Sequence, residues 1–240
     1  MIVKPYDNDE ATKKTLVALM FDNISRKYDF LNHFLSLGID KIWRKKAIKM
    51  LNEYKNANIL DVATGTGDFA IAALKLNPKK VIGIDISKGM LKYGNIKIAK
   101  KNISNITLQY GDSENMDFDD KSFDVITVGF GVRNFENLEK GLKEFYRVLN
   151  DNGAAAILEF SKPRKFPVKQ LYKFYFNNIL PFLGKLFSKD KSAYTYLPKS
   201  VEAFPEGKEF IDILKKTGFK KIIEKRLAFG IASIYFAKKK

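Results

Sequence analysis

Hydrophobic positions in the middle of the chain alternate between short apolar runs and longer stretches with helical spacing. The short runs predict strands at 58–62, 81–85, 106–110, 124–130 and 154–160. Helical spacing follows at 69–76, 87–101 and 138–149. Residues 124–130 show no regular apolar–polar alternation, which is typical of a strand that helices cover on both faces. This order predicts an α/β fold with a doubly wound, mostly parallel sheet of Rossmann type.

Both ends of the chain add elements to this sheet. Apolar residues from Val17 to Tyr28 follow helical spacing, and a second helix is expected to begin at Asp40 as its N-cap. These helices precede the first strand, so we expect them to form a cap over the ligand cleft. A helix at 207–216 is followed by strands 222–227 and 232–237, which are close enough to pair in antiparallel orientation. The sheet should therefore have seven strands, with an antiparallel last strand.

One domain is expected, because 240 residues with 45% hydrophobic content suffice for one α/β core. We divide it into an N-terminal helical cap (1–56), a cofactor-binding core (57–162), a helical insertion (163–200) and a C-terminal helix with two strands (201–240). The insertion interrupts the α/β alternation and carries Leu171, Tyr175, Ile179, Phe182 and Leu186 at helical spacing. Pro181 is expected to kink or end this helix.

The amino-acid composition favours some classes of function and excludes others. Lys and Arg number 43 against 27 Asp and Glu, a net charge of +16, which favours anionic partners such as nucleic acid or an acidic membrane leaflet. A lysine-rich solvated surface explains this charge equally well. The absence of cysteine excludes disulfides and thiolate chemistry, and a single histidine, His33, argues against a histidine-rich metal site. No signal core or run of about 18 apolar residues is present, so we expect a soluble, cytoplasmic protein without a metal.

The stretch DVATGTGDFA at 61–70 has the pattern of a strand, a glycine turn and a helix. Gly65 and Gly67 allow a sharp turn and close approach to a ligand, and the helix N-terminus offers free N–H groups. Together with Ala70 and Asp85 they also match the loose dinucleotide pattern G-x-G-x-x-G/A. Asp61 favours another ligand, because a carboxylate suits the ammonium and sulfonium groups of S-adenosylmethionine better than a pyrophosphate.

Small or acidic residues lie at or just after the carboxyl ends of predicted strands, namely Asp61, Asp85, Asp112 and Gly129. Since ligands bind outside the carboxyl ends of parallel strands, we expect these residues to meet in one crevice. Asp85 suits the two hydroxyls of a ribose. Asp112 and Ser113 suit an adenine amino group, although turn formation alone also favours them.

Several stretches resemble the ubiquinone/menaquinone biosynthesis C-methyltransferases. These are DVATGTGD, VIGIDIS, GFGVRNFENLEKGLKEFYRVL, LEFSKP and, upstream, FDNISRKYDFLNHFLSLGIDKIWRKK. The first is common to all class I methyltransferases, whereas the upstream block, GFGVRN and LEFSKP are specific to this family. The resemblance implies methyl transfer from S-adenosylmethionine to a ring carbon of a polyprenylated quinol. It also implies cofactor contacts at Thr66, Asp85, Ile86, Asp112 and Ser113, while some family members have a serine where this chain has Gly129.

Methylation of a ring carbon needs an electron-rich ring, so the site must stabilise a phenolate. Arg133, with Asn134 beside it, is the expected electrophilic partner because its guanidinium is always cationic. A salt bridge is the alternative role of Arg133. For the base, Asp29, His33 and a water held by Arg133 remain open, although a lone histidine among apolar residues is more often a packed residue. Tyr28 is expected to line the ring pocket, with core packing as the alternative.

The helical insertion and the absence of nucleic-acid methyltransferase motifs predict which partners the protein binds. Basic and aromatic residues around an apolar stripe at 164–191 predict transient association with the membrane surface, on the inner face of the cell membrane; a plain cap helix or a homodimer face is the alternative. A nucleic-acid-binding module or nucleic-acid methyltransferase is the rival class. The sequence has no Asn/Asp-Pro-Pro-Tyr/Phe tetrad and no cysteine for attack on a pyrimidine, so we expect no nucleic-acid partner. Overall resemblance favours a naphthoquinol over a benzoquinol acceptor.

Overall fold

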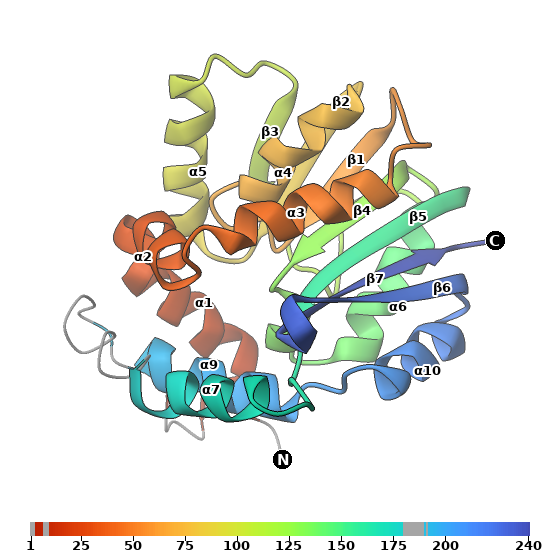
Figure 1. Cartoon of the computed structure of the whole chain (residues 1–240). Coiled ribbons are helices and arrows are strands. Elements are labelled where there is room, and N and C mark those ends of the chain that lie inside the picture. Colours follow the sequence, from red (N-terminus) through yellow and green to blue (C-terminus); the bar gives the residue numbers. More distant parts are fainter. Residues whose placement is uncertain (1–2, 7–9, 180–189, 191) are drawn as a thin grey trace.

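A seven-stranded sheet with the order β3-β2-β1-β4-β5-β7-β6 forms the centre of the molecule in the computed structural model, which describes all residues except 1–2, 7–9, 180–189 and 191 (Figure 1). The strands are β1 Asn58–Val62, β2 Lys80–Asp85, β3 Ile106–Tyr110, β4 Phe123–Gly129, β5 Leu149–Phe160, β6 Lys220–Leu227 and β7 Ala232–Lys238. The first five are parallel, and β7 pairs in antiparallel orientation with both β5 and β6. The expected fold class is confirmed.

Helices cover both faces of the sheet because its central strands are apolar on both sides. On β1, Ile59 belongs to one buried cluster, whereas Leu60 and Val62 belong to the other. The first cluster lies under α3 Ile39–Met50, α4 Asp68–Ala73 and α5 Lys88–Lys100. The second lies under α6 Leu138–Val148, which is behind the sheet in Figure 1, and α10 Lys208–Thr217, which is at the lower right. This sandwich explains why strand 124–130 lacks a solvent-facing side.

A layer of helices from distant parts of the chain lies at the carboxyl ends of the strands. It contains α1 Lys13–Ile24, α2 Tyr28–Leu35, α7 Val168–Phe174 and α9 Ser192–Ala203, gathered below the sheet in Figure 1. The turns η1 Ser25–Lys27 and η4 Tyr175–Ile179 connect to these helices. Val17, Met20 and Leu31 pack with Phe176 and Tyr196 in a third apolar cluster. The N-terminal segment and the insertion therefore build one cover over the same edge of the sheet.

Two local predictions were wrong. Helix α3 begins at Ile39 after Gly38, whose φ of 73° supplies the left-handed cap conformation, so Asp40 is not the N-cap but a buried residue of the first turn. Strand β5 begins at Leu149 instead of the predicted residue 154, and it contains a register shift opposite Phe123 and Val125. In contrast, α5 begins where the helix at 87–101 was predicted, and Ser87 is its N-cap, accepting a hydrogen bond from the Met90 N–H at 3.1 Å. Pro181, Phe182 and Leu186 lie outside the described residues.

Candidate active site

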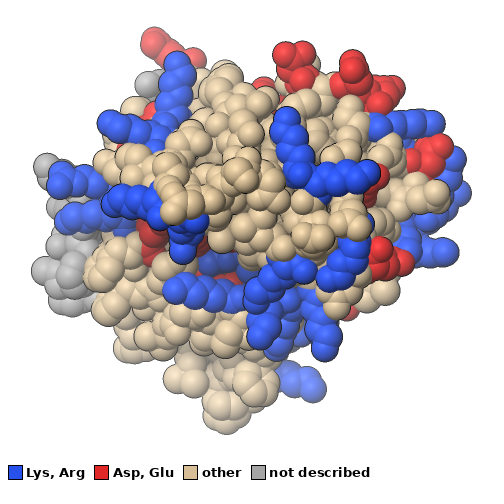
Figure 2. Space-filling model, turned by 90° about the horizontal axis from the view of Figure 1, so that it is seen from above, with Lys and Arg blue, Asp and Glu red and all other residues tan. Residues whose placement is uncertain are grey.

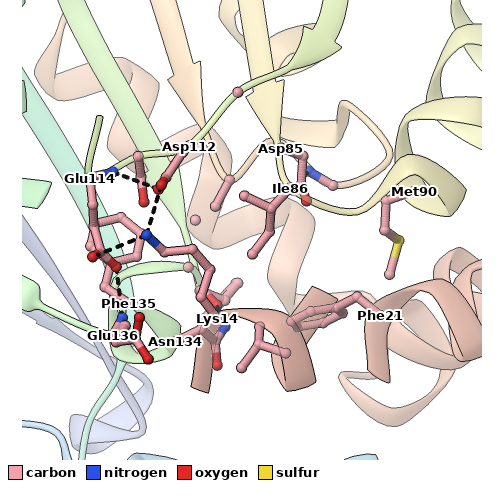
Figure 3. A pocket seen from close by; sticks show the side chains of 18 of the residues that line it. Lys14, Phe21, Asp85, Ile86, Met90, Asp112, Glu114, Asn134, Phe135 and Glu136 are labelled. Carbon is pink, nitrogen blue, oxygen red and sulfur yellow. Dashed lines mark hydrogen bonds and ion pairs between the residues drawn. The ribbon is translucent and has the colours of Figure 1, made fainter. Parts of the chain in front are cut away.

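The loops after β1, β2, β3 and β4 enclose a pocket at the switch point of the sheet, where β1 lies between β2 and β4. We call it the polar pocket because several carboxylates line it among apolar side chains. Its lining includes Gly65, Asp85, Ile86, Asp112, Ser113, Gly129 and Asn134. In the close view of Figure 3, Ile86 lies between Asp85 and Asp112. The structure thus brings together most of the residues expected to contact the cofactor, because parallel strands end at a common edge.

The glycine turn is tied to the end of the second strand. Gly65 and Gly67 have φ angles of 57° and 82°, a left-handed conformation that favours glycine. The Gly65 N–H donates to Asp85 Oδ2 at 2.8 Å, and the Ser87 N–H donates to Asp85 Oδ1 at 2.8 Å. Burial raises the pKa of Asp85 to about 6, although the two hydrogen bonds oppose this increase. The carboxylate is therefore ionised at neutral pH and held in a fixed orientation at the pocket wall.

Asp61 lies behind the glycine turn and does not line the polar pocket. Its side chain belongs to the face of β1 that α4 covers, and it accepts hydrogen bonds from Thr64 Oγ1 at 2.6 Å, Thr127 Oγ1 at 2.7 Å and the Ala70 N–H at 3.0 Å. Asp61 lines only a small adjoining cavity, which shares Gly65 with the polar pocket. Its visible role is to hold the turn against the start of α4; direct contact with a ligand ammonium stays a prediction.

Lys14 of α1 enters the polar pocket, which the sequence did not indicate. Its Nζ lies 2.7 Å from Asp112 Oδ2 and 3.3 Å from Glu114 Oε2, as the dashed lines in Figure 3 show. The second oxygen of Asp112 accepts the Glu114 N–H at 2.9 Å. An adenine amino group at Asp112 would therefore share the carboxylate with Lys14. No local pattern links α1 to this loop, because the two lie about a hundred residues apart.

A second, largely apolar cavity of about 420 Å³ lies between the sheet edge and the helical cover. Its wall contains Trp43, Phe130, Phe160, Tyr172 and Phe176. The ring centres of Phe130 and Phe160 are 4.5 Å apart. The rings of Tyr172 and Phe176 are stacked, with their centres 4.2 Å apart. A wall rich in aromatic rings suits an aromatic ligand.

Three aromatic residues, Phe21, Tyr28 and Phe130, line both the polar pocket and the apolar cavity. The two spaces therefore meet at these side chains. Tyr28 lies at this junction, as expected for a residue of the ring pocket, and burial raises its pKa to about 12, so its hydroxyl stays protonated at neutral pH. A ligand in each space would bring two reacting groups together here.

Arg133 lines the apolar cavity from η3 Val132–Asn134, the turn after β4. Its Nη1 lies 2.9 Å from Glu159 Oε1 and also donates to the Phe130 carbonyl. Glu159 is fully buried, and its burial raises its pKa while the guanidinium opposes that shift. The salt bridge considered as the alternative role is thus present. The Arg133 Nε nevertheless has no hydrogen-bond partner among the described residues, so one donor of the buried guanidinium is left unsatisfied.

Asn134 and Gly129 complete the polar pocket on the β4 side. The Asn134 Nδ2 donates to the Phe130 carbonyl at 3.3 Å, whereas its Oδ1 is buried without a partner among the described residues. A Cβ at Gly129 would lie 2.9 Å from the Phe69 ring, so the serine of other family members would need a shift of that ring. Asn134 Oδ1 is therefore an acceptor available to a cofactor, and Gly129 shapes the wall.

Asp29 and Thr66 do not occupy the places expected of them. Asp29 lines neither space, because its carboxylate accepts a hydrogen bond from the Thr66 hydroxyl and pairs with Lys97 Nζ at 2.5 Å. Asp29 is therefore not positioned to act as the base. The Thr66 side chain is correspondingly directed to Asp29 and Lys97 and lines only the small adjoining cavity.

His33 is a bridging residue outside both spaces. Its Nδ1 lies 2.9 Å from Asp40 Oδ2 and its Nε2 lies 3.4 Å from Asp68 Oδ2. Arg44 contacts the same two carboxylates, so a guanidinium already balances the charge that a metal ion would otherwise neutralise. His33 is a packed, hydrogen-bonded residue, and it does not line the apolar cavity that a base would have to reach.

Comparison with known proteins gives relatives that cover nearly the whole chain. The chain matches the ubiE/COQ5 methyltransferase family over residues 9–239. A demethylmenaquinone methyltransferase of Bacteroides fragilis is 49% identical over 239 residues, which cover 99% of this chain and 97% of that protein. The ubiquinone/menaquinone biosynthesis C-methyltransferase UbiE of Geotalea daltonii is 46% identical over 223 residues, 92% of this chain and 94% of that protein.

Solved structures support the fold. A SAM-dependent methyltransferase of Thermotoga maritima, described as a possible histamine N-methyltransferase, superposes with a TM-score of 0.63 at 19% identity, covering 92% of this chain and 99% of that one. At this identity the likeness extends to the fold alone.

Proposed function

The chain belongs to the ubiE/COQ5 methyltransferase family, and on that premise we propose that it transfers a methyl group from S-adenosylmethionine to a ring carbon of demethylmenaquinol. The relatives from Bacteroides fragilis and Chlorobaculum tepidum are demethylmenaquinone methyltransferases, which favours a naphthoquinol as acceptor. A prenylated benzoquinol is the runner-up, because the relative from Geotalea daltonii is named for both quinones.

The observation that carries this proposal is the junction of the two spaces at Phe21, Tyr28 and Phe130. The polar pocket offers carboxylates and a glycine turn for a nucleoside. The apolar cavity has the volume and aromatic lining that a prenylated ring needs. Only a reaction between a polar cofactor and an apolar aromatic acceptor uses both.

The residues of the polar pocket fit S-adenosylmethionine, which supplies an electrophilic methyl group. Asp85 would accept hydrogen bonds from the ribose hydroxyls, and Asp112 and Ser113 would hold the adenine. The buried, unpartnered Asn134 Oδ1 would accept a hydrogen bond from the ammonium group.

On the acceptor side, Arg133 stabilises the negative charge that develops on the quinol oxygen. A cation is most effective in an apolar, water-poor wall, and the Arg133 side chain is only 8% exposed. Since neither Asp29 nor His33 lines the cavity, we propose that a water beside Arg133 relays the phenolic proton to solvent while the guanidinium stabilises the phenolate. Ionisation then makes the ring carbon nucleophilic.

The direct test is mass spectrometry after incubation of the protein with methyl-labelled S-adenosylmethionine and a reduced, short-prenyl demethylmenaquinol. We expect label on a ring carbon. A short-prenyl benzoquinol in the same tube decides between the two acceptors, since the preferred one is consumed first. Label on a quinol oxygen would contradict C-methylation, and no transfer to either quinol would contradict the proposed function.

We also propose that the mouth of the apolar cavity docks on an anionic bilayer. Leu37 and Leu171 line the cavity and yet are 83% and 64% exposed, and Phe174 is 59% exposed. Lys169 and Lys173 are exposed on the same helix, α7. Apolar side chains flanked by lysines suit the boundary between acyl chains and acidic head groups. Within the described ranges, no helix is long and apolar enough to cross a membrane.

Charge at this mouth should control binding to vesicles. Reversal of Lys169 and Lys173 to Glu is expected to lower binding to anionic liposomes at least about 10-fold at low salt, because each basic residue near such a surface contributes about 1 kcal/mol. Liposome flotation at low and high salt measures this effect. The matched control reverses Lys100 and Lys101, which are exposed at the far end of α5.

If both variants lose liposome binding to the same extent, net charge alone causes the binding, and docking through α7 is contradicted. Lys and Arg are indeed spread over the face shown in Figure 2, with fewer Asp and Glu among them. Absence of binding at low salt would contradict membrane association altogether.

A further inference from the structure

Two tyrosine hydroxyls in the wall of the apolar cavity are buried without a partner. Tyr172 OH and Tyr196 OH, like Arg133 Nε, are buried side-chain atoms with no hydrogen bond to any described residue. All three residues line the cavity. Buried polar atoms in native proteins are nearly always hydrogen-bonded, and an unpaired one costs stability. Three such atoms on residues that line one cavity therefore indicate polar groups whose partner is a ligand.

These hydroxyls lie close to Arg133 in the fold although they are distant in the sequence. Tyr196 belongs to α9, which packs against η3, the turn that carries Arg133. Tyr172 belongs to α7 and stacks on Phe176. The centre of the Phe176 ring lies 6.2 Å from the centre of the Phe160 ring. The Arg133 guanidinium is 5.5 Å from the centre of the Phe160 ring. The polar atoms thus border an aromatic wall suited to a flat ring.

The protonation state of the two tyrosines suits hydrogen-bond donation. Burial raises the pKa of both hydroxyls, that of Tyr196 to about 12, and nearby Arg133 only partly offsets the shift. Both hydroxyls therefore remain protonated at neutral pH. Each can donate one hydrogen bond and accept another.

We propose that Tyr172 and Tyr196 form, with Arg133, the subsite that binds the two ring oxygens of the quinol and so positions the ring for methylation. This inference rests on the proposed function and adds two positioning residues to it. A ring lacking one oxygen would leave a buried hydroxyl unpaired. Such a site discriminates strongly against ligands that lack the matching group.

The test measures this discrimination with ligands that do not react. Competitive inhibition constants are determined anaerobically for a 2-methyl-3-prenyl-naphthohydroquinone and for the two naphthols that each lack one of its hydroxyls. The wild-type protein should bind the hydroquinone about 5–30-fold more tightly than either naphthol, as expected for one buried hydrogen bond. Tyr172→Phe and Tyr196→Phe should each abolish the preference over one naphthol, with affinity for S-adenosylhomocysteine unchanged.

Tyr175→Phe is the matched control. Tyr175 also lines the cavity, but its hydroxyl already donates to the Leu35 carbonyl at 2.9 Å. This variant should melt at a lower temperature and keep the full discrimination, whereas Tyr172→Phe and Tyr196→Phe, which remove unpaired hydroxyls, should melt no lower than the wild type. Variants at 172 and 196 that retain the wild-type discrimination would overturn the inference. If the wild-type protein methylates neither quinol, the proposed function fails instead.

Discussion

Replacement of Arg133 by alanine is expected to lower kcat by about 10²–10³-fold, the usual effect of losing one donor that stabilises developing charge. The effect falls on kcat more than on KM because negative charge on the quinol oxygen grows only as the proton leaves. Arg133→Lys should recover part of the loss, since the ammonium keeps the charge but not the planar fork. Steady-state kinetics with the labelled methyl donor measures both constants.

The salt bridge of Arg133 requires a control for stability. Alanine at 133 leaves the fully buried Glu159 without its counterion, which is expected to cost about 3–5 kcal/mol of unfolding free energy. The double variant Arg133→Met with Glu159→Gln removes both charges together and should restore most of the melting temperature. We expect its kcat to stay low. Recovery of kcat along with stability, or an unchanged kcat in Arg133→Ala, would reduce Arg133 to a structural residue.

Replacement of Asp85 by alanine is expected to weaken binding of S-adenosylhomocysteine by about 10–150-fold, or about 1.5–3 kcal/mol, because hydrogen bonds to a charged group are lost. Isothermal titration calorimetry measures the affinity directly. The same experiment with NADH separates the two cofactor classes. Binding of NADH without binding of S-adenosylhomocysteine would contradict the methyltransferase site.

Asp85 should also make cofactor binding depend on pH. Its pKa in the free protein is raised to about 6, and only the ionised carboxylate can accept hydrogen bonds from both ribose hydroxyls. Affinity should therefore be constant above about pH 7 and decrease as the pH falls through 6. Asp61 has a similarly raised pKa, also about 6, so Asp85→Asn is the necessary control. A pH-independent affinity in Asp85→Asn assigns the titration to Asp85, and an unchanged slope assigns it to another group.

Local patterns in the sequence determined the sheet and the cofactor side of the site. The strand at 58–62 was predicted with its observed limits, because a buried strand needs an apolar run whatever its partners are. Gly65 and Gly67 marked the turn, since positive φ angles require residues of this type. Asp85 and Asp112 could be placed in one pocket because the carboxyl ends of parallel strands share an edge.

Tertiary structure alone decided how the charged groups pair. Lys14 with Asp112, Arg133 with Glu159 and Lys97 with Asp29 each join segments that no local periodicity relates. The acceptor cavity is lined by helices that are far apart in the sequence, such as the one that carries Leu31 and the one that carries Tyr196. Packing of this kind depends on the whole tertiary structure, because these partners meet only where the sheet and the helices bring distant segments together. The sequence therefore determines which residues are available for chemistry here, whereas the fold decides which of them reach the same space.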